Sequence, residues 1–343
     1  MYNITLHGSL LSLDIDSRLL RDNPLGDPNQ RQFPVYLPPD YDESHQRFPT
    51  IYALAGFTGT GQNMPNFNVW EESLPEQIDD LIVNGDCPPV IVVMPDCFTG
   101  LGGSQYVNST ATGAYEDYIV TEIIPLVDRK LRTLAAGNHR GVIGKSSGGY
   151  GALRLAMRHP GLFGSVACQS GDMYFEYSYL RDFPVAVNGL NQAGGLAAFL
   201  EQFARSRKKG ALIPTLNIIA MAAAYSPRDS KPELPFDLPS GELIPEVWER
   251  WLAFDPIRMV DTPEAAAALR DLNLLFIDAG ERDEYALHLG ARIFVSKLYN
   301  LGITHEYEEF PDGHFGINYR MKTGLEKVAR SLFDTHDPAV MQS

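Results

Sequence analysis

The stretch GKSSGG at residues 144–149 decides the fold of this chain. It fits the pattern G-x-S-x-G, in which a serine stands on a sharp turn between a strand and a helix. Residues 140–144 are typical of a short buried strand, and residues 150–159 are typical of a helix. The glycines two positions either side of Ser146 carry no side chain that would collide at such a turn. The stretch therefore predicts that Ser146 is a nucleophile.

The composition bounds the class of protein. The chain has 343 residues and is 44% hydrophobic, which is enough for one large α/β domain with insertions. Its net charge of −15 argues against nucleic acid and against an anionic membrane surface, because both would repel it. We therefore expect a small-molecule substrate, and we interpret the acidity as a source of solubility.

The sequence gives no sign of a membrane segment, a leader or a metal site. No stretch is long and apolar enough to span a bilayer, and the first residues lack the regions of a signal peptide. The three cysteines, Cys87, Cys97 and Cys168, are well separated and form no CxxC pair, so neither disulfides nor zinc are indicated. We expect a cytoplasmic protein that needs no metal or cofactor.

Apolar runs and helical patterns alternate along the chain. The apolar runs are continuous, as expected for parallel strands covered on both faces, and they lie at 35–37, 50–54, 90–94, 141–143, 165–168, 274–277 and 304–308. An earlier run at 6–13 is expected to begin the sheet in antiparallel fashion. Helical patterns occupy 70–83, 115–131, 287–301 and 321–333, and Pro125 predicts a kink or break. This alternation predicts a doubly wound, mostly parallel α/β sheet.

One segment, residues 172–255, interrupts the alternation. It has no clear strand, and it contains helical patterns at 195–207, 214–224 and 246–254 around a proline-rich stretch. We expect residues 1–171 and 256–343 to form the core, with 172–255 as a helical insertion over the carboxyl edge of the sheet. Its role as a lid or as the contact of a homodimer is left open.

A nucleophilic serine needs a histidine base and a carboxylate that orients this base. The loop after the strand at 274–277 holds four acids, and we expect Asp283 to be the orienting one, although it could instead cap the next helix. Asp278, Glu281 and Glu284 are the alternatives. In the turn after the last strand, His314 stands between two glycines and is the expected base, since His305 falls within a strand.

The developing negative charge on the substrate also needs two N–H donors. One is expected from Ser147, directly after the nucleophile. The other is expected from Phe57 in the glycine-rich loop at residues 54–61, which follows an early strand. A phosphate-binding loop is the alternative, but the spacing GxxxxGK[ST] is missing.

Together these motifs resemble the putative-esterase family of α/β hydrolases. This family includes esterase D (S-formylglutathione hydrolase), feruloyl esterases, enterobactin esterase-like proteins and the antigen 85 mycolyltransferases. The resemblance covers about residues 30–330, least in the insertion, and rests on the segments at 35–41, 56–59, 95–96, 104–109, 144–153, 278–283 and 312–314. It implies an α/β-hydrolase fold, a triad of Ser146, Asp283 and His314, and oxyanion donors at Phe57 and Ser147.

The substrate pocket is predicted from residues that follow strands and from the insertion. Tyr106 and Asn108 are expected near its mouth, and Met173 and Tyr174 follow the strand after the nucleophile helix. Trp248 and Trp251 share a helix face, where they could either roof an apolar or aromatic group or pack the insertion onto the core. Lys145 departs from the residues frequent in the family, and it is interpreted as solvated or as favouring an acidic substrate.

The sequence thus predicts a serine carboxylesterase that hydrolyses small or medium acyl esters, including aromatic ones, through an acyl-enzyme. A thioesterase acting on S-formylglutathione or an acyltransferase is the first alternative. A non-catalytic binding protein on the same fold is the second.

Overall fold

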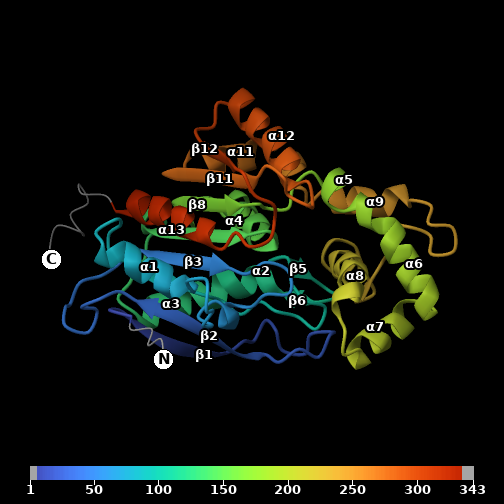
Figure 1. The fold of residues 1–343 in the computed structure, drawn as a ribbon, viewed down its shortest axis with the longest axis horizontal. Coiled ribbons are helices and arrows are strands. Elements are labelled where there is room, and N and C mark those ends of the chain that lie inside the picture. The colour runs from blue at the N-terminus through green and yellow to red at the C-terminus, as the bar shows by residue number, and fades with distance from the viewer. Residues whose placement is uncertain (1–5, 334–343) are drawn as a thin grey trace.

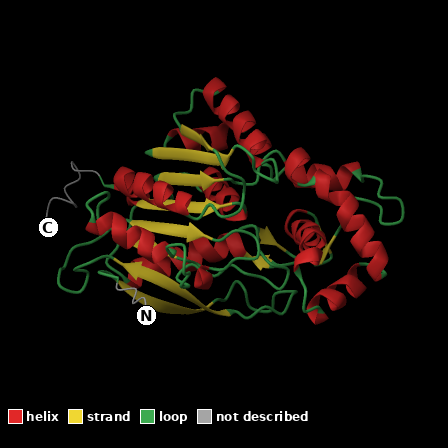
Figure 2. Ribbon diagram, viewed as in Figure 1, coloured by secondary structure: helices red, strands yellow, loops and turns green. Residues whose placement is uncertain are grey.

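An eight-stranded sheet runs through the centre of the protein (Figures 1 and 2). The computed structural model describes residues 6–333. In the order in which they lie side by side, the strands are β1 (Ser9–Asp16), β2 (Gln30–Leu37), β4 (Ile91–Val93), β3 (Thr50–Leu54), β7 (Arg140–Lys145), β8 (Ser165–Gln169), β11 (Leu274–Gly280) and β12 (Glu306–Phe310). This is the α/β-hydrolase architecture that the sequence predicts.

The pairing directions bring several strand ends to one edge. β1 pairs with β2, and β2 with β4, in antiparallel fashion, whereas the six strands from β4 to β12 are parallel. Leu54 lies opposite Gly144, and Gly144 lies opposite Cys168. The loops that follow β3, β7 and β8 therefore emerge together, which is where a site can form.

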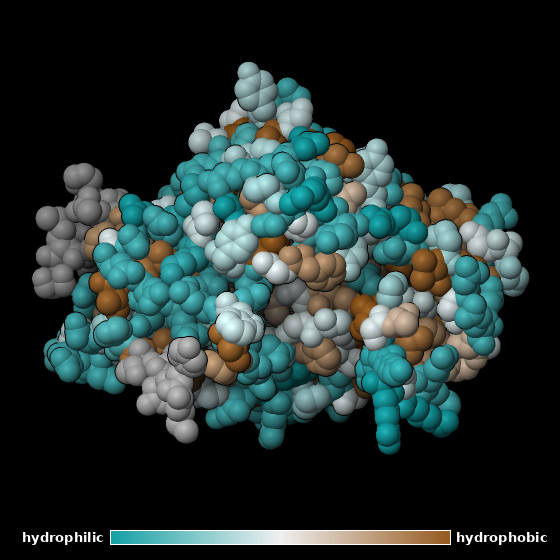
Figure 3. Space-filling view, in the orientation of Figure 1, coloured by the Kyte–Doolittle hydropathy of each residue, from teal (hydrophilic) through white to brown (hydrophobic). Residues whose placement is uncertain are grey.

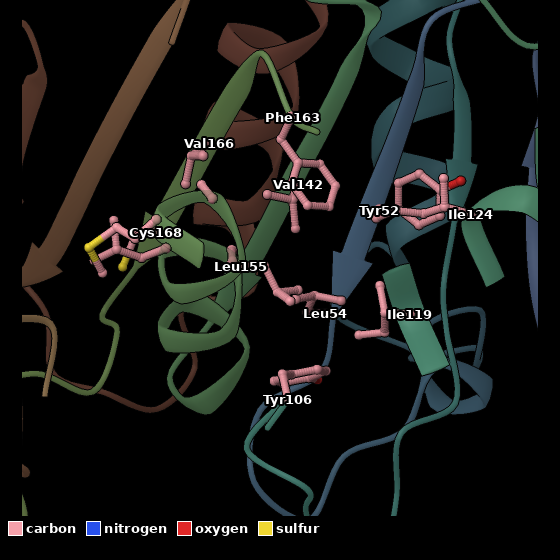
Figure 4. Close-up of a cluster of buried hydrophobic side chains, with 14 of the residues drawn as sticks. Tyr52, Leu54, Tyr106, Ile119, Ile124, Val142, Leu155, Phe163, Val166 and Cys168 are labelled. Carbon is pink, nitrogen blue, oxygen red and sulfur yellow. The ribbon is translucent and has the colours of Figure 1, made fainter. Parts of the chain in front are cut away.

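Helices cover both faces of the sheet. One face is covered by α1 (Leu74–Val83) and α13 (Tyr319–Leu332). The other packs against α3 (Ile124–Lys130), α4 (Ser147–Arg158), α11 (Pro263–Arg270) and α12 (Leu287–Asn300). Figure 4 shows part of this second core, in which Leu155 of α4 lies among strand residues such as Val142 and Val166.

Local sequence sets where these helices begin and break. α1 begins at Leu74 rather than near residue 70, because Ser73 and Glu76 form a capping box there. Near Pro125, where a kink or break was predicted, the helix changes type without interruption: α2 (Tyr115–Asp117) runs into a π-helical turn at Tyr118–Ile123, and α3 begins with this proline in its first turn.

The segment 172–255 forms a second group of helices beyond the carboxyl ends of the strands (Figure 1). It contains α5 (Phe175–Ser178), α6 (Phe183–Ala193), α7 (Leu196–Arg205), α8 (Ile213–Tyr225) and α9 (Pro245–Leu252), with a small hairpin of β9 (Pro227–Arg228) and β10 (Lys231–Pro232). A short α10 (Pro256–Met259) leads back to the core, and another small hairpin, β5 (Asn108–Ser109) and β6 (Gly113–Ala114), precedes α2.

Helix α6 was not expected, because Gly189 in its interior disfavours a helix, although Pro184 lies in the first turn, where proline is tolerated. Packing explains it. A Cβ on Gly189 would lie 2.5 Å from Thr215 Oγ1 of α8, so the missing side chain lets the two helices approach closely. Tertiary contact therefore overrides the local preference here.

An aromatic cluster holds the helical group together. Trp251 is fully buried, and its ring lies 5.7 Å from those of Tyr225, Phe183 and Trp248. Its indole N–H donates to Ser226 Oγ at 2.7 Å. Figure 3 shows the outer face of this region with hydrophobic side chains among hydrophilic ones. Of the two predicted roles for the tryptophan pair, the structure displays the packing one.

No helix within residues 6–333 is long and apolar enough to cross a membrane. The three cysteines are free and buried, and Cys168 lies within β8 as the sequence predicts.

We predict that Trp251→Ala destabilises the protein by about 3–5 kcal/mol, because it empties a fully buried site and leaves Ser226 without its donor. Chemical denaturation monitored by circular dichroism measures this. Trp70→Ala is the matched control, since Trp70 is 91% exposed, and it is expected to change stability by less than about 0.5 kcal/mol. Equal effects of the two substitutions would contradict the assignment of Trp251 to the core.

Candidate active site

Ser146 stands between β7 and α4 in a strained backbone conformation, with φ 58° and ψ −126°. The turn is closed on both sides, since the Ser146 N–H donates to the carbonyl of Gln169 at 2.9 Å and its own carbonyl accepts from the Tyr150 N–H at 2.9 Å. A Cβ on Gly144 would lie 2.9 Å from the Cα of Gly148, so the turn needs glycine there. The predicted strand, turn and helix are all present.

The structure brings the three predicted triad residues together. His314 Nε2 lies 3.1 Å from Ser146 Oγ, and His314 Nδ1 lies 2.7 Å from Asp283 Oδ2. Both His314 and Asp283 are 5% exposed. This is the geometry that a serine nucleophile, a histidine base and an orienting carboxylate require.

Asp283 contacts both the imidazole and the backbone at the start of the next helix, the two possibilities that the sequence left open. Its Oδ2 faces His314, while its Oδ1 accepts the backbone N–H groups of Tyr285 at 2.9 Å and Leu287 at 3.3 Å. The carboxylate is thus tied to the beginning of α12 by one oxygen and to the imidazole by the other. The capping bonds fix the orientation of the oxygen that contacts His314.

The other acids of this loop lie elsewhere. Asp278 is buried under the sheet edge, where burial raises its pKa to about 6 although Arg320 pairs with it at 2.9 Å. Glu284 accepts the backbone N–H of His314 at 2.6 Å, which holds the histidine loop in place. Glu281 is exposed. Glu284 is therefore a supporting residue whose function the sequence did not indicate.

The glycine-rich loop after β3 lies beside the serine. A Cβ on Gly56 would be 3.5 Å from Ser146 Cβ, so the loop backbone is in close contact with the turn. Thr58 has a positive φ of 66° and donates its N–H to the carbonyl of Gly102 at 3.1 Å. Among the described residues, the Phe57 and Ser147 amides donate to no acceptor, so both predicted oxyanion donors are available to a ligand.

A chain of contacts supports this loop from below. The hydroxyl of Tyr106 donates to the carbonyl of Ala55 at 2.5 Å, and Arg154 of α4 donates to the carbonyl of Tyr106 at 3.3 Å. Arg154 also pairs with the buried Glu116 at 2.7 Å. Burial acts to raise the pKa of Glu116, but hydrogen bonds from His159 and Arg154 outweigh it and lower this pKa to about 2.

The side chain of Ser147 is held by a residue that the sequence did not single out. Its Oγ lies 3.0 Å from Asp172 Oδ2, which also accepts the hydroxyl of Tyr179 at 3.0 Å. Asp172 is fully enclosed, and burial raises its pKa. In the sequence, only the position of Asp172, shortly after the strand at 165–168, indicated that it lies near the site.

An open pocket of about 830 Å³ lies over Ser146 and His314. It is walled by the segment from Leu54 to Gln77 and by the beginning of α13, and Lys145 lines it as well. The apolar part of the lining comprises Leu54, Ala55, Phe57, Met64, Phe67, Val69, Leu74, Phe315 and Met321. No residue of the segment 172–255 contributes to the lining of this pocket.

The six residues predicted to bind substrate lie outside this lining. Tyr106 is buried under the loop at Ala55, and the side-chain oxygen Oδ1 of Asn108 accepts the backbone N–H of Asp117 at 3.0 Å. The other four are Met173, which is buried against α12, Tyr174, whose ring packs on Tyr177, and Trp248 and Trp251 in the aromatic cluster. Four of the six belong to the segment 172–255, which contributes nothing to the lining of this pocket.

The chain is similar in sequence to known proteins. A model of the family described as "Putative esterase" matches residues 28–315. An esterase of Mycobacterium tuberculosis is 25% identical over 300 residues, which is 82% of this chain and 51% of that protein. An endo-1,4-beta-xylanase/feruloyl esterase of Xylanibacter ruminicola is 29% identical over 150 residues, covering 41% of this chain and 19% of that protein. The chain thus spans about half the length, or less, of these relatives.

Solved structures show the same fold. A ferulic acid esterase superposes with a TM-score of 0.63 at 18% identity, covering 96% of this chain and all of the other. A fluorophosphonate-binding serine hydrolase of Staphylococcus aureus superposes with a TM-score of 0.60 at 17% identity, covering 95% of this chain and 99% of the other.

We predict that Gly148→Ala impairs the turn. Its Cβ would overlap the carbonyl oxygen of Leu54 and lie 2.9 Å from that of Ala55, so the loop after β3 must move. Thermal unfolding should show that the free energy of unfolding falls by about 1–3 kcal/mol. The reaction of Ser146 with a fluorophosphonate probe should slow about 100-fold. Gly210→Ala, with no atom within 4 Å of the added Cβ, is the control expected to change neither.

Glu116 should make stability depend on pH. Its pKa is lower in the folded protein, at about 2, than its ordinary value of 4.5, so its contribution is complete above pH 4.5 and is lost as the pH falls toward 2. Glu116→Gln should lower the melting temperature at pH 7 and flatten the decrease between pH 4.5 and 2. Parallel melting curves of both proteins across this range would contradict the assignment.

Proposed function

Because the chain belongs to the esterase family, whose model covers most of its length, we propose that it is a serine hydrolase of carboxylic esters that acts through an acyl-enzyme. The observation that carries this proposal is the continuous hydrogen-bonded array from Asp283 through His314 to Ser146. The strained turn at Ser146 and the two free amides beside it support the same chemistry.

In the proposed first half-reaction, Ser146 Oγ attacks the carbonyl carbon of the ester while His314 Nε2 takes the hydroxyl proton. Asp283 holds the imidazole in the tautomer that presents Nε2 as an acceptor, and it stabilises the imidazolium that forms. The Phe57 and Ser147 amides donate to the oxygen that becomes negatively charged in the tetrahedral intermediate. His314 then gives its proton to the departing alcohol.

In the second half-reaction, a water molecule takes the place of the alcohol. His314 removes a proton from this water as it attacks the acyl carbon, and then returns the proton to Ser146 Oγ as the acid leaves. The net change is one ester and one water converted to one carboxylic acid and one alcohol.

The substrates we propose are small or medium acyl esters, including aromatic ones. The support is the pocket of about 830 Å³, whose wall includes the rings of Phe57, Phe67 and Phe315 together with aliphatic side chains. Such a lining favours an apolar acyl or aryl group through burial of its surface. Relatives named as feruloyl esterases are consistent with this class.

The test is hydrolysis of 4-nitrophenyl acetate and 4-nitrophenyl butyrate by the wild type and by Ser146→Ala, His314→Ala and Asp283→Asn. Loss of Ser146 or His314 should lower kcat by about 10⁴- to 10⁶-fold, because each removes the group that attacks or that accepts the proton. Ser240→Ala, on an exposed loop, is the control expected to retain wild-type activity.

Labelling by a fluorophosphonate probe provides a second measurement. The wild type should be labelled at Ser146, and the alanine variant should not. A wild type that neither hydrolyses these esters nor reacts with the probe, or a Ser146→Ala variant with most of its activity, would overturn the proposal.

A further inference from the structure

The residue directly before Ser146 is Lys145, a lysine that belongs to the lining of the pocket. Lys145 is the last residue of β7 and is half-buried. Its ammonium group forms no ion pair or hydrogen bond with any residue in the part of the chain that the structure describes. A cation thus borders the reacting serine without a partner of opposite charge.

The acids that surround Lys145 are engaged elsewhere. Asp283 is bound to His314, and Glu284 accepts the backbone N–H of His314 at 2.6 Å. At the pocket rim, the exposed Glu72 pairs with Lys322 at 3.0 Å, and the exposed Glu71 accepts the side-chain amide of Asn318 at 2.8 Å. Because Glu71 and Glu72 are exposed, solvent screens their charges, whereas the half-buried Lys145 is screened less.

An unpaired ammonium in such a place is energetically unfavourable. Burial lowers the pKa of Lys145, although the nearby charges of Asp283 and Glu71 oppose this effect. Buried and half-buried charges in proteins are ordinarily paired, because removal from water must be compensated by an ionic or hydrogen-bonding partner. An anionic group that entered the pocket would provide that partner.

We propose that Lys145 determines substrate specificity by binding an anionic group, a carboxylate, carried by the ester whose carbonyl reacts with Ser146. This inference rests on the proposed esterase function and narrows its substrate class to acidic esters. The apolar wall of the pocket holds the carbon skeleton of such a substrate, and Lys145 holds its charged end. A lysine ammonium suits this role because three donors on a flexible stem adapt to a carboxylate.

The experiment compares pairs of esters that differ in charge. 4-Nitrophenyl hydrogen adipate carries a carboxylate on the acyl side, and 4-nitrophenyl heptanoate is its neutral counterpart. 4-Acetoxybenzoate carries the carboxylate on the alcohol side, and methyl 4-acetoxybenzoate is its neutral counterpart. For each pair, the measured quantity is the ratio of kcat/KM for the anionic ester to that for the neutral ester.

Lys145→Met keeps an unbranched apolar stem in place of the lysine stem and removes the charged ammonium group. In at least one pair, we expect this substitution to lower the ratio by about 10- to 100-fold, the range for a hydrogen bond to a charged group. The pair that responds identifies the side of the ester on which the anion lies. Taking the ratio removes any general change in reactivity, which matters because Lys145 adjoins the nucleophile.

Three controls make the result specific to charge at this position. Lys145→Arg should retain most of the wild-type ratio, and increasing the NaCl concentration should lower the ratio for the wild type but not for Lys145→Met. Lys208→Met, at an exposed position in the segment 172–255, should behave as the wild type.

The outcomes separate this inference from the function on which it rests. Ratios that Lys145→Met leaves unchanged in both pairs, with neutral esters still hydrolysed, would overturn the role of Lys145 alone. A wild type that hydrolyses none of the four esters and resists the fluorophosphonate probe would overturn the esterase proposal itself.

Discussion

The positive φ of Ser146 is the constraint on which the rest of the site depends. A serine in this conformation is strained, and it persists because β7, β8 and α4 hold the turn from both sides. The same closeness places Gly148 against the carbonyl of Leu54 at the end of β3. The loop that continues from β3 is consequently brought beside the serine, so one tight turn positions both the nucleophile and the amides of Phe57 and Ser147.

The sequence was sufficient to predict those parts of the site whose positions are fixed by short motifs and by strand order. Parallel strands end at one edge, so the residues after β7, β11 and β12 had to converge, and Ser146, Asp283 and His314 do so. Asp283 contacts both groups that the sequence proposed for it, His314 and the backbone that leads into α12, because a carboxylate has two oxygens and each binds one of them. Local chemistry and topology together determined this part of the structure.

The walls of the pocket could not be predicted in the same way. Their positions depend on how long loops and the helical segment pack, which neither periodicity nor turn chemistry encodes. Helix α6 exists because Gly189 admits Thr215 of α8, and the two tryptophans lie in a core that only the assembled helices create. The pocket is walled instead by the continuation of the glycine-rich loop through Phe67 and Val69. A single segment thus supplies a predicted oxyanion donor and much of the surface that a substrate meets.

The segment 172–255 nevertheless contacts the site, through Asp172. Asp172, its first residue, contacts the side chain of Ser147, whose backbone N–H is one of the two proposed oxyanion donors. Tyr179 joins the same carboxylate and packs on Tyr225 and Trp251, so the aromatic cluster is continuous with the beginning of α4. The hydrogen bond between Ser147 Oγ and Asp172 restrains Ser147. The packing of these helices therefore affects the orientation of the Ser147 backbone amide, a proposed oxyanion donor. We therefore propose that the segment acts by fixing the geometry of α4, while the loop after β3 and Lys145 line the pocket that a substrate would enter.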